Sequence, residues 1–420
     1  MLREYRDAVR DFSPNARLYL TATVLLGLTS GLQYLFFNLY VLSLGYDQAF
    51  VGLLASLPAL VTAAAAIPIG MALPRLGFRR ALLLGSLLIA IALAACALVP
   101  SRGVLIAAAI LSGLGSALTS VASSPLMVAI STEKTRTHLF GFQFAFSTFA
   151  GVFANLIGGY LPLALRAIAP DFLAGLSAYR GVLLVAMALT LATLYPLARL
   201  RGLRGARERP MIARQIRAHR SVLAKVLAVE ITGSLGAGML MPFLNVFYRL
   251  RFDLSDPALG ALFAASSLLT GIAAILAPLA ASRLGKVRAM VLTQALSIPF
   301  LLVMGFVPMA GVSATSYLVR TALMNMSSPL LPAYIMGIVP GELRPLAASL
   351  VMLAWNAGWG ISSWISGHIQ VAAGFSPLFL ITAGFYVTSI VLTYAFFRRM
   401  AETTDAQAAP SPSTDEDPHA

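Results

Sequence analysis

The chain contains twelve long runs of mostly apolar residues, and these runs restrict its possible folds more than any other feature. A helix needs about 20 apolar residues to cross the hydrocarbon core of a bilayer. Short charged stretches and turn residues bound the runs, and we predict helices at 18–43, 49–73, 78–99, 103–128, 139–165, 178–198, 222–248, 257–281, 289–308, 312–338, 345–370 and 376–397. The boundaries near 308–311 and 374–377 depend on Gly and Pro alone. The sequence therefore predicts an all-α membrane protein with twelve transmembrane helices.

The composition agrees with this fold class and excludes several kinds of site. Of the 420 residues, 59% are hydrophobic and 11% are charged, whereas soluble globular proteins have about 25% charged residues. Cys96 is the single cysteine, and the four histidines are scattered without zinc-ligand spacing. The sequence also lacks a phosphate-binding Walker loop. We expect no cofactor, no metal site and no enzymatic activity.

The net charge of +14 at pH 7 is distributed as in a membrane protein. Most lysines and arginines fall in short connectors on one side of the predicted helices, and the largest group lies between residues 199 and 225. Cytoplasmic loops carry such an excess of positive charge. We therefore predict a multi-pass protein of the cytoplasmic (inner) membrane with both termini in the cytoplasm, and we expect no nucleic-acid partner.

A polar stretch at residues 199–221 divides the predicted helices into two groups of six. The last twenty residues are rich in Ala, Pro, Ser, Thr and acidic side chains, a composition typical of disordered segments. We predict a cytoplasmic arm at 1–17, an N-terminal six-helix bundle at 18–198, a basic linker at 199–221, a C-terminal six-helix bundle at 222–397 and a disordered cytoplasmic tail at 398–420.

The two groups of helices repeat several features at a shift of 207 or 208 residues. Asn38 corresponds to Asn245, and Gly52 corresponds to Gly260. The connector that holds Arg75, Gly77 and Arg80 has a second copy that holds Arg283, Gly285 and Arg288. Parallel repeats of six helices are a known transporter architecture, with the substrate site at their interface. We therefore predict two pseudo-symmetric six-helix bundles.

The connector after the second helix, from Gly70 through Pro74 to Arg80, resembles the signature of the major facilitator superfamily, a Gly…Asp-Arg-x-Gly-Arg-Arg pattern. The acidic position of that signature is Pro74 in the first copy and Ser282 in the second. The resemblance implies alternating access, a central cavity lined by helices 1, 4, 7 and 10, and a cytoplasmic gate. The gate candidates are Arg75, Gly77, Arg80, Glu133, Arg136, Arg283, Gly285, Arg288, Glu342 and Arg344. The alternative is that the arginines only mark the cytoplasmic side and the acids are solvated.

Two charged residues lie deep inside predicted helices, Glu230 in the seventh and Arg320 in the tenth. An intramembrane charge costs about 2.5–3.5 kcal/mol on insertion scales, so each is a candidate for function. Their positions along the two helices leave roughly 6 Å between them in depth in a core of about 30 Å. Three alternatives remain open: Glu230 exchanges a proton under the influence of Arg320, Arg320 binds an anionic group of the substrate, or the two residues form a permanent structural ion pair.

Polar and aromatic residues on the same helices are candidates for the rest of a substrate cavity. They are Gln33, Tyr34, Asn38, Asn245, Asn325, Trp355, Asn356 and Trp359. Aromatic rings with amides suit an amphipathic or sugar-like ligand. The alternative is that the amides hold neighbouring helices together, which is common in membranes.

These features predict a secondary active transporter that moves a small organic solute across the inner membrane by alternating access. We expect H⁺ as the coupling ion, lipid around the chain, a small-molecule substrate and a monomeric protein. The alternatives are an uncoupled facilitator or a sugar or lipid exporter and, in another class, a transporter-like receptor or accessory subunit that moves no solute. The substrate itself and the direction of transport stay open.

Overall fold

The computed structural model describes residues 11–168, 177–201, 219–340 and 343–398, and no strand occurs within these ranges. The N-terminal half comprises α2 (Pro14–Ser43), α3 (Gln48–Leu76), α4 (Phe78–Leu98), α5 (Arg102–Ile130), α6 (Glu133–Ile168), α7 (Ala178–Ala192) and α8 (Leu194–Ala198). The C-terminal half comprises α10 (Arg220–Leu240), η1 (Met241–Phe243), α11 (Leu244–Phe252), α12 (Asp256–Leu284), α13 (Lys286–Phe306), α14 (Ala310–Asn325), α15 (Leu330–Ile338), α16 (Arg344–Ala373) and α17 (Ser376–Phe397). Taken with their short breaks, these helices form the twelve predicted spans, and the all-α prediction is confirmed.

Helix bounds agree with the prediction to within a few residues, including the two boundaries that rest on turn residues alone. The largest difference is at α6, which was expected from residue 139 and begins at Glu133. An acidic side chain in the first turn of a helix interacts favourably with its N-terminal dipole, so Glu133 favours the earlier start of this helix. The predicted arm, linker and tail lie largely outside the described residues.

Ten of the described helical segments are long and apolar enough to cross a membrane. Two expected spans do not meet this criterion, the tenth and the eleventh. The tenth is interrupted between α14 and α15, and α16 carries a series of Ser, Asn, His and Gln side chains along its length. Both helices line the central cavity described below, with Asn325 and Asn356 among the lining residues. Ser363 and Ser366 of α16 instead donate to the carbonyl groups of Gly238 and Met239.

Two of the predicted helices, 222–248 and 312–338, are each interrupted by a short turn that the sequence did not predict, and a proline lies in each turn. Proline lacks a backbone N–H and its ring clashes with the preceding turn. Pro242 lies in the 3₁₀ turn η1, and Ser363 Oγ instead donates to the carbonyl of Gly238, 3.1 Å away. Pro329 lies in the turn between α14 and α15, where the carbonyl of Asn325, four residues earlier, accepts from the Ser328 N–H at 3.1 Å.

The two halves repeat the same turn where the second helix of each meets the third. Gly77 ends α3 with φ 78° and ψ 149°, and Gly285 ends α12 with φ 79° and ψ 150°. Positive φ is accessible to glycine at little cost and is strained for residues with a Cβ atom. The matching backbone angles confirm the repeat predicted from the two connectors.

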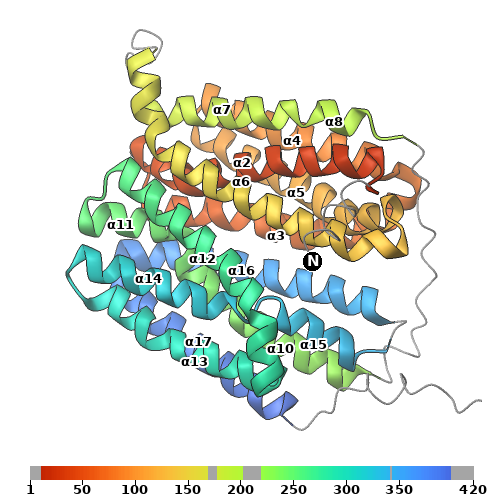
Figure 1. Ribbon diagram of the computed structural model, residues 1–420. Helices are drawn as coiled ribbons and strands as arrows, with labels where there is room; N and C mark the ends of the chain where they lie inside the picture. The colour runs from red at the N-terminus through yellow and green to blue at the C-terminus, as the bar shows by residue number, and fades with distance from the viewer. Residues whose placement is uncertain (1–10, 169–176, 202–218, 341–342, 399–420) are drawn as a thin grey trace, which may run out of the picture.

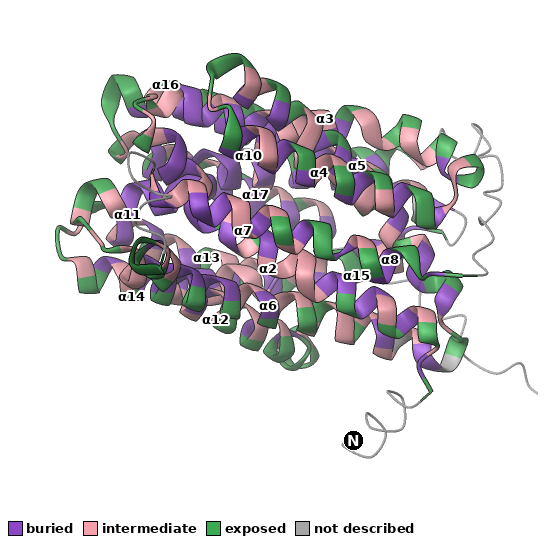
Figure 2. Cartoon of the chain, turned by 90° about the horizontal axis from the view of Figure 1, so that it is seen from above, coloured by how far each residue is buried: buried purple, intermediate pink, exposed green. Residues whose placement is uncertain are grey.

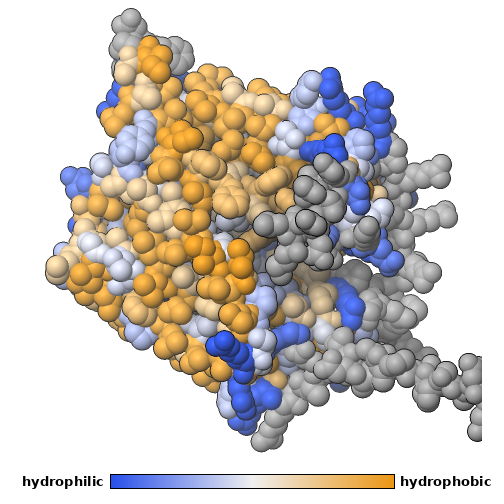
Figure 3. Space-filling model, in the orientation of Figure 1, coloured by the Kyte–Doolittle hydropathy of each residue, from blue (hydrophilic) through white to orange (hydrophobic). Residues whose placement is uncertain are grey.

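Contacts between the halves are concentrated in two helix pairs, α3 with α16 and α6 with α12, and α2 makes smaller contacts with α11 and α12. Most other packing joins helices of the same half, such as α4 with α5 and α10 with α17. Figure 2 shows buried residues on the inner faces of the helices and exposed residues around the periphery. In Figure 3 hydrophobic residues cover the body of the molecule, and hydrophilic residues gather mainly at the right-hand side and the lower edge, with a smaller group at the left. This distribution is the one expected of a chain whose solvent is lipid over most of its surface.

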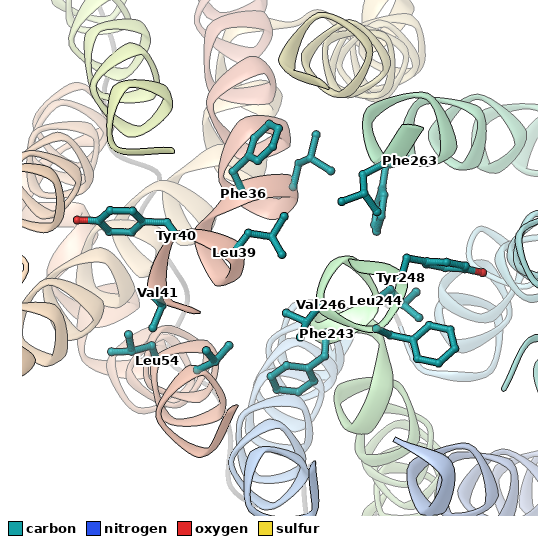
Figure 4. Close-up of a cluster of buried hydrophobic side chains, with 14 of the residues drawn as sticks. Phe36, Leu39, Tyr40, Val41, Leu54, Phe243, Leu244, Val246, Tyr248 and Phe263 are labelled. Carbon is teal, nitrogen blue, oxygen red and sulfur yellow. The ribbon is translucent and has the colours of Figure 1, made fainter. Parts of the chain in front are cut away.

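The buried apolar side chains show that the halves are joined at one end only. We call the end where α2 begins and α17 ends the terminus end, on the right in Figure 1, and the opposite one the far end. One cluster at the far end includes side chains of both halves, among them Phe36 and Leu39 on one side and Phe243 and Phe263 on the other (Figure 4). At the terminus end each half has a separate cluster. The described part of the molecule is therefore closed at its far end and parted at its terminus end.

Candidate functional site

A central cavity of about 710 Å³ lies between the halves. Helices α2 and α6 line it from the N-terminal half, and α10, α12, α14 and α16 contribute most of the wall from the C-terminal half. Glu230 and Arg320 are the two charged residues of this lining among the residues described. The cavity therefore unites the two intramembrane charges that the sequence singled out.

Arg320 on α14 is only 3% exposed, and its guanidinium group has no anionic partner among the described residues. One terminal nitrogen donates to the hydroxyl of Tyr386 at 2.7 Å, and the other approaches the sulfur of Met241 at 2.9 Å. The guanidinium also lies over the Tyr386 ring, 5.4 Å from its centre. Its Nε–H is buried without a hydrogen-bond partner. A buried cation held only by neutral groups is costly and favours binding of an anion.

Glu230 on α10 is 7% exposed and borders the same cavity. No hydrogen bond or ion pair joins its carboxyl group to another residue that the structure describes. In particular, Glu230 and Arg320 do not form a salt bridge in this conformation. A permanent structural ion pair would be present here, so the structure opposes the third of the three alternatives and leaves the first two.

All but one of the predicted cavity residues lie in two cavities, and Tyr34 and Trp359 line both of them. Tyr34, Asn325, Trp355, Asn356 and Trp359 line the central cavity. Gln33, Tyr34, Asn38 and Trp359 line a second, smaller pocket. Asn245 lines neither and is 1% exposed, so its placement in the cavity was wrong for this conformation.

Asn38 and Asn245 instead form a paired contact between the halves. Asn38 Nδ2 donates to the Pro242 carbonyl at 2.6 Å, and Asn245 Nδ2 donates to the Leu35 carbonyl at 2.8 Å. Leu35 and Pro242 are related by the same shift of 207 residues as the two asparagines, so the two bonds are pseudo-symmetric. The side chains also meet each other, with Asn38 Nδ2 3.3 Å from Asn245 Oδ1. We call this the asparagine clasp.

A second polar contact at the far end was missed by the sequence analysis. Asp256 at the start of α12 pairs with Arg249 of α11, and Tyr179 of α7 donates to the same carboxylate oxygen at 2.9 Å. The Tyr179 hydroxyl comes from the other half, so the cluster links the two halves. A tyrosine and an aspartate on distant helices leave no spacing pattern in the sequence.

Glycines allow the closest approaches between the halves. A Cβ atom on Gly52 would lie 2.8 Å from the Cα of Gly367. A Cβ atom on Gly260 would lie 2.7 Å from the Cα of Gly159 and 2.5 Å from the carbonyl oxygen of Asn155. Gly52 and Gly260 occupy equivalent positions in the repeat. The crossing of α3 with α16 and that of α6 with α12 therefore both depend on a glycine at the contact, which is the small-residue packing typical of membrane helices.

The gate candidates that the structure describes lie at the terminus end. Arg75, Arg80, Glu133, Arg283, Arg288 and Arg344 are exposed, and Arg136 is half-buried. In the described part of the chain no ion pair joins Glu133 to any of these arginines. Glu342 lies outside the described residues.

The smaller pocket has a volume of about 300 Å³ and extends into the N-terminal half. Apolar side chains of α2, α3, α4 and α5 make up most of its wall, and Cys96 lies among them. The sequence analysis did not find this pocket, because an apolar residue of a membrane helix has the same signature whether it faces lipid, core or cavity. We call it the side pocket.

Comparisons with known proteins agree on one family. The sequence profile of the Major Facilitator Superfamily matches residues 19–319 and 226–415. No curated protein matches the sequence. The fold is similar to a D-xylose–proton symporter (TM-score 0.74, 14% identity, 93% of this chain and 98% of that chain). It is also similar to the nucleoside transporter NupG (TM-score 0.70, 15% identity, covering 91% of this chain and 100% of that chain).

A third similar structure is a bacterial homologue of the human lysosomal transporter Spinster in an inward-facing, occupied conformation (TM-score 0.70, 15% identity, covering 92% of this chain and 96% of that chain). At these identities the likeness shows the fold alone. The profile match covers most of the chain, and it agrees with the glycine turns, the repeat and the twelve spans. The chain belongs to the major facilitator superfamily and is a membrane transporter, not an enzyme.

Proposed function

We propose that the protein is a secondary active transporter that moves a small organic solute across the inner membrane by alternating access, with H⁺ as the coupling ion. The observation that carries this proposal is the cavity between the halves, which contains a carboxyl group and a guanidinium group that do not neutralise each other. In this proposal the protein acts as a monomer surrounded by lipid, and the apolar face seen in Figure 3 supports the contact with lipid.

The arginine-rich connectors support a cytoplasmic position of the terminus end. With that orientation the conformation is inward-open, since the halves part at the terminus end and meet at the far end. The outward-open state requires the asparagine clasp and the Asp256 cluster to separate. The exposed gate residues of the two connectors then approach one another and close the cytoplasmic side.

Glu230 is the proton carrier in this scheme. A charged carboxylate is costly in the membrane interior, so the neutral, protonated form crosses between the two states more readily. Arg320 lies in the same cavity and interacts electrostatically with both the bound solute and Glu230, so the charge of the solute influences the protonation of Glu230. The similar D-xylose–proton symporter and nucleoside transporter carry small organic molecules, one of them with a proton, and this supports the proposal.

Replacement of Glu230 by Gln tests the coupling. We expect proteoliposomes loaded with a pH-sensitive dye to show proton movement when a transported solute from a panel that includes D-xylose and uridine is added. Glu230→Gln should retain solute exchange and lose about 90% or more of the proton movement, because the amide cannot be protonated at neutral pH. Asp253→Asn is the matched control, since this exposed aspartate lies at the far end with a left-handed backbone that Asn also adopts.

Each result distinguishes the proposal from an alternative. Solute flux that is insensitive to pH, with Glu230→Gln as active as wild type, would show an uncoupled facilitator. Saturable binding without flux of any bound solute would show a transporter-like receptor.

A further inference from the structure

The cavity system is chemically divided between the two halves of the protein. The central cavity carries both charged residues on helices of the C-terminal half, whereas the side pocket in the N-terminal half has no Asp, Glu, Lys or Arg in its described lining. We propose that the transported solute is an amphipathic organic anion, with its anionic group on Arg320 and its apolar body in the side pocket. This inference rests on the proposed function, since it names the substrate class of the same site.

The anionic end of the solute is specified by the state of Arg320. A guanidinium group has five N–H donors in a planar fork. Two of its nitrogens contact only Tyr386 and the sulfur of Met241, both neutral, and the Nε–H has no partner. Carboxylate, sulfonate and phosphate groups match this fork with two parallel hydrogen bonds. An uncharged solute would leave the buried cation without a counter-charge, and a cationic solute would be repelled.

The apolar end is specified by the side pocket. Its wall includes Phe37, Leu54, Pro58, Leu93, Ala108 and Ala109. At about 300 Å³ it lies at the lower end of the range of ligand sites, and transfer of apolar surface from water into it contributes about 25 cal/mol per Å². The polar groups of the pocket, including Gln33, Asn38 and Ser112, are a minority of its lining. This chemistry suits a hydrocarbon or aromatic body better than a polyhydroxylated one.

Two shared lining residues and two contacts through Met241 bring the binding sites for the two ends of the solute close together. Tyr34 and Trp359 border both the central cavity and the side pocket. Tyr34 is 43% exposed, and its hydroxyl donates to the Met241 carbonyl at 2.9 Å. Met241 also contacts Arg320 through its sulfur. One residue therefore touches both the anion-binding arginine and the tyrosine at the mouth of the side pocket.

An anionic solute also sets the direction of coupling. Protonation of Glu230 removes a negative charge from the cavity, which favours the binding of an anion to Arg320. By reciprocity, the bound anion favours protonation of Glu230. The solute and the proton consequently cross in the same direction.

Equilibrium binding of a matched series of aryl compounds to the purified full-length protein in nanodiscs tests the inference. The series comprises tritiated 1-naphthylacetate, its neutral amide, the cation 1-naphthylmethylamine, the corresponding naphthyl sulfonate and phosphate, and acetate as an anion without an apolar body. Nanodiscs of phosphatidylcholine alone and with phosphatidylglycerol distinguish a soluble anion from an anionic lipid headgroup, because a competing lipid would weaken binding of the probe.

We expect at least one naphthyl anion to bind at least tenfold more tightly than the amide, the amine and acetate. Arg320→Gln should remove the preference for the anion over the amide. Ala109→Leu should weaken binding of the naphthyl anion at least tenfold by filling the side pocket. Ala107→Leu, on the exposed face of the same helix, is the control that should leave binding unchanged.

Three results would overturn the inference: equal binding of anion, amide and amine, an anion preference that survives Arg320→Gln, or no saturable binding of any naphthyl anion. The readout is independent of proton movement. Loss of coupling with intact anion selectivity would contradict the proposed coupling alone, and coupling with no anion selectivity would contradict the substrate class alone.

Discussion

Gly260→Leu is expected to reduce transport about 100-fold while the protein still inserts and folds. The added Cβ atom would lie 2.5 Å from the Asn155 carbonyl oxygen and 2.7 Å from the Gly159 Cα, both backbone atoms that cannot rotate away. Overpacking of this kind costs about 1–3 kcal/mol, and a shift of about 3 kcal/mol changes an equilibrium about 100-fold. The clash exists only when α6 and α12 meet at the far end, so the conformation closed at that end becomes rare.

Gly52→Leu should have the same effect, because its Cβ atom would lie 2.8 Å from the Ser363 carbonyl oxygen at the symmetric crossing of α3 with α16. Gly384→Leu is the matched control, since nothing lies within 4 Å of a Cβ atom at that helical position. Solute flux measures the loss of transport. The rate at which a single cysteine at the far end is chemically modified measures how rare the conformation closed at that end has become. Wild-type flux in Gly260→Leu would mean that the halves do not need to meet there.

Loss of the asparagine clasp is expected to shift the protein toward the conformation open at the far end. Removing one amide of a buried hydrogen-bonded pair costs about 1–3 kcal/mol because its partner stays buried and unsatisfied. Asn38→Ala or Asn245→Ala should therefore raise the population of the far-end-open state by about 5–100-fold, since 1.4 kcal/mol corresponds to a factor of ten.

A double-mutant cycle identifies the clasp as one unit. The Asn38→Ala/Asn245→Ala variant should open less than the sum of the two single changes, because each single variant already breaks part of the shared contact. The measurement is the far-end distance distribution of spin labels in all four proteins. Strictly additive changes, or no change in any variant, would show that the two side chains do not hold the far end closed.

The spans could be predicted from the sequence because the bilayer demands a long apolar run for each crossing. The two interruptions could not. Other membrane helices of this chain, such as α5 with Pro125 and α13 with Pro299, continue through an internal proline. Whether a helix breaks at Pro242 depends on distant groups such as Ser363, which satisfies the freed Gly238 carbonyl. Such compensation is a property of the folded structure.

The candidate site likewise contains residues that could be recognised from their own helix and contacts that depend on the packing of other helices. Glu230 and Arg320 could be identified because a charge inside an apolar run is costly anywhere in a membrane helix. Asn245 was predicted to line the cavity, but an amide in a helix has the same sequence signature when it holds two helices together. The sequence also contained the clue to its partner, since Asn38 lies at the equivalent position of the repeat. Tyr386 and Met241, the neighbours of Arg320, lie on other elements and carry no local signal.

Distances between spin labels at the two ends of the protein test alternating access most directly. With Cys96 replaced by Ser, one label pair would join positions 101 and 311 at the far end, and another would join positions 79 and 282 at the terminus end. We predict that a fraction of molecules shows a longer far-end distance together with a shorter terminus-end distance, and that Gly260→Leu increases this fraction. Distances at the two ends that stay fixed, or that lengthen together, would contradict the account.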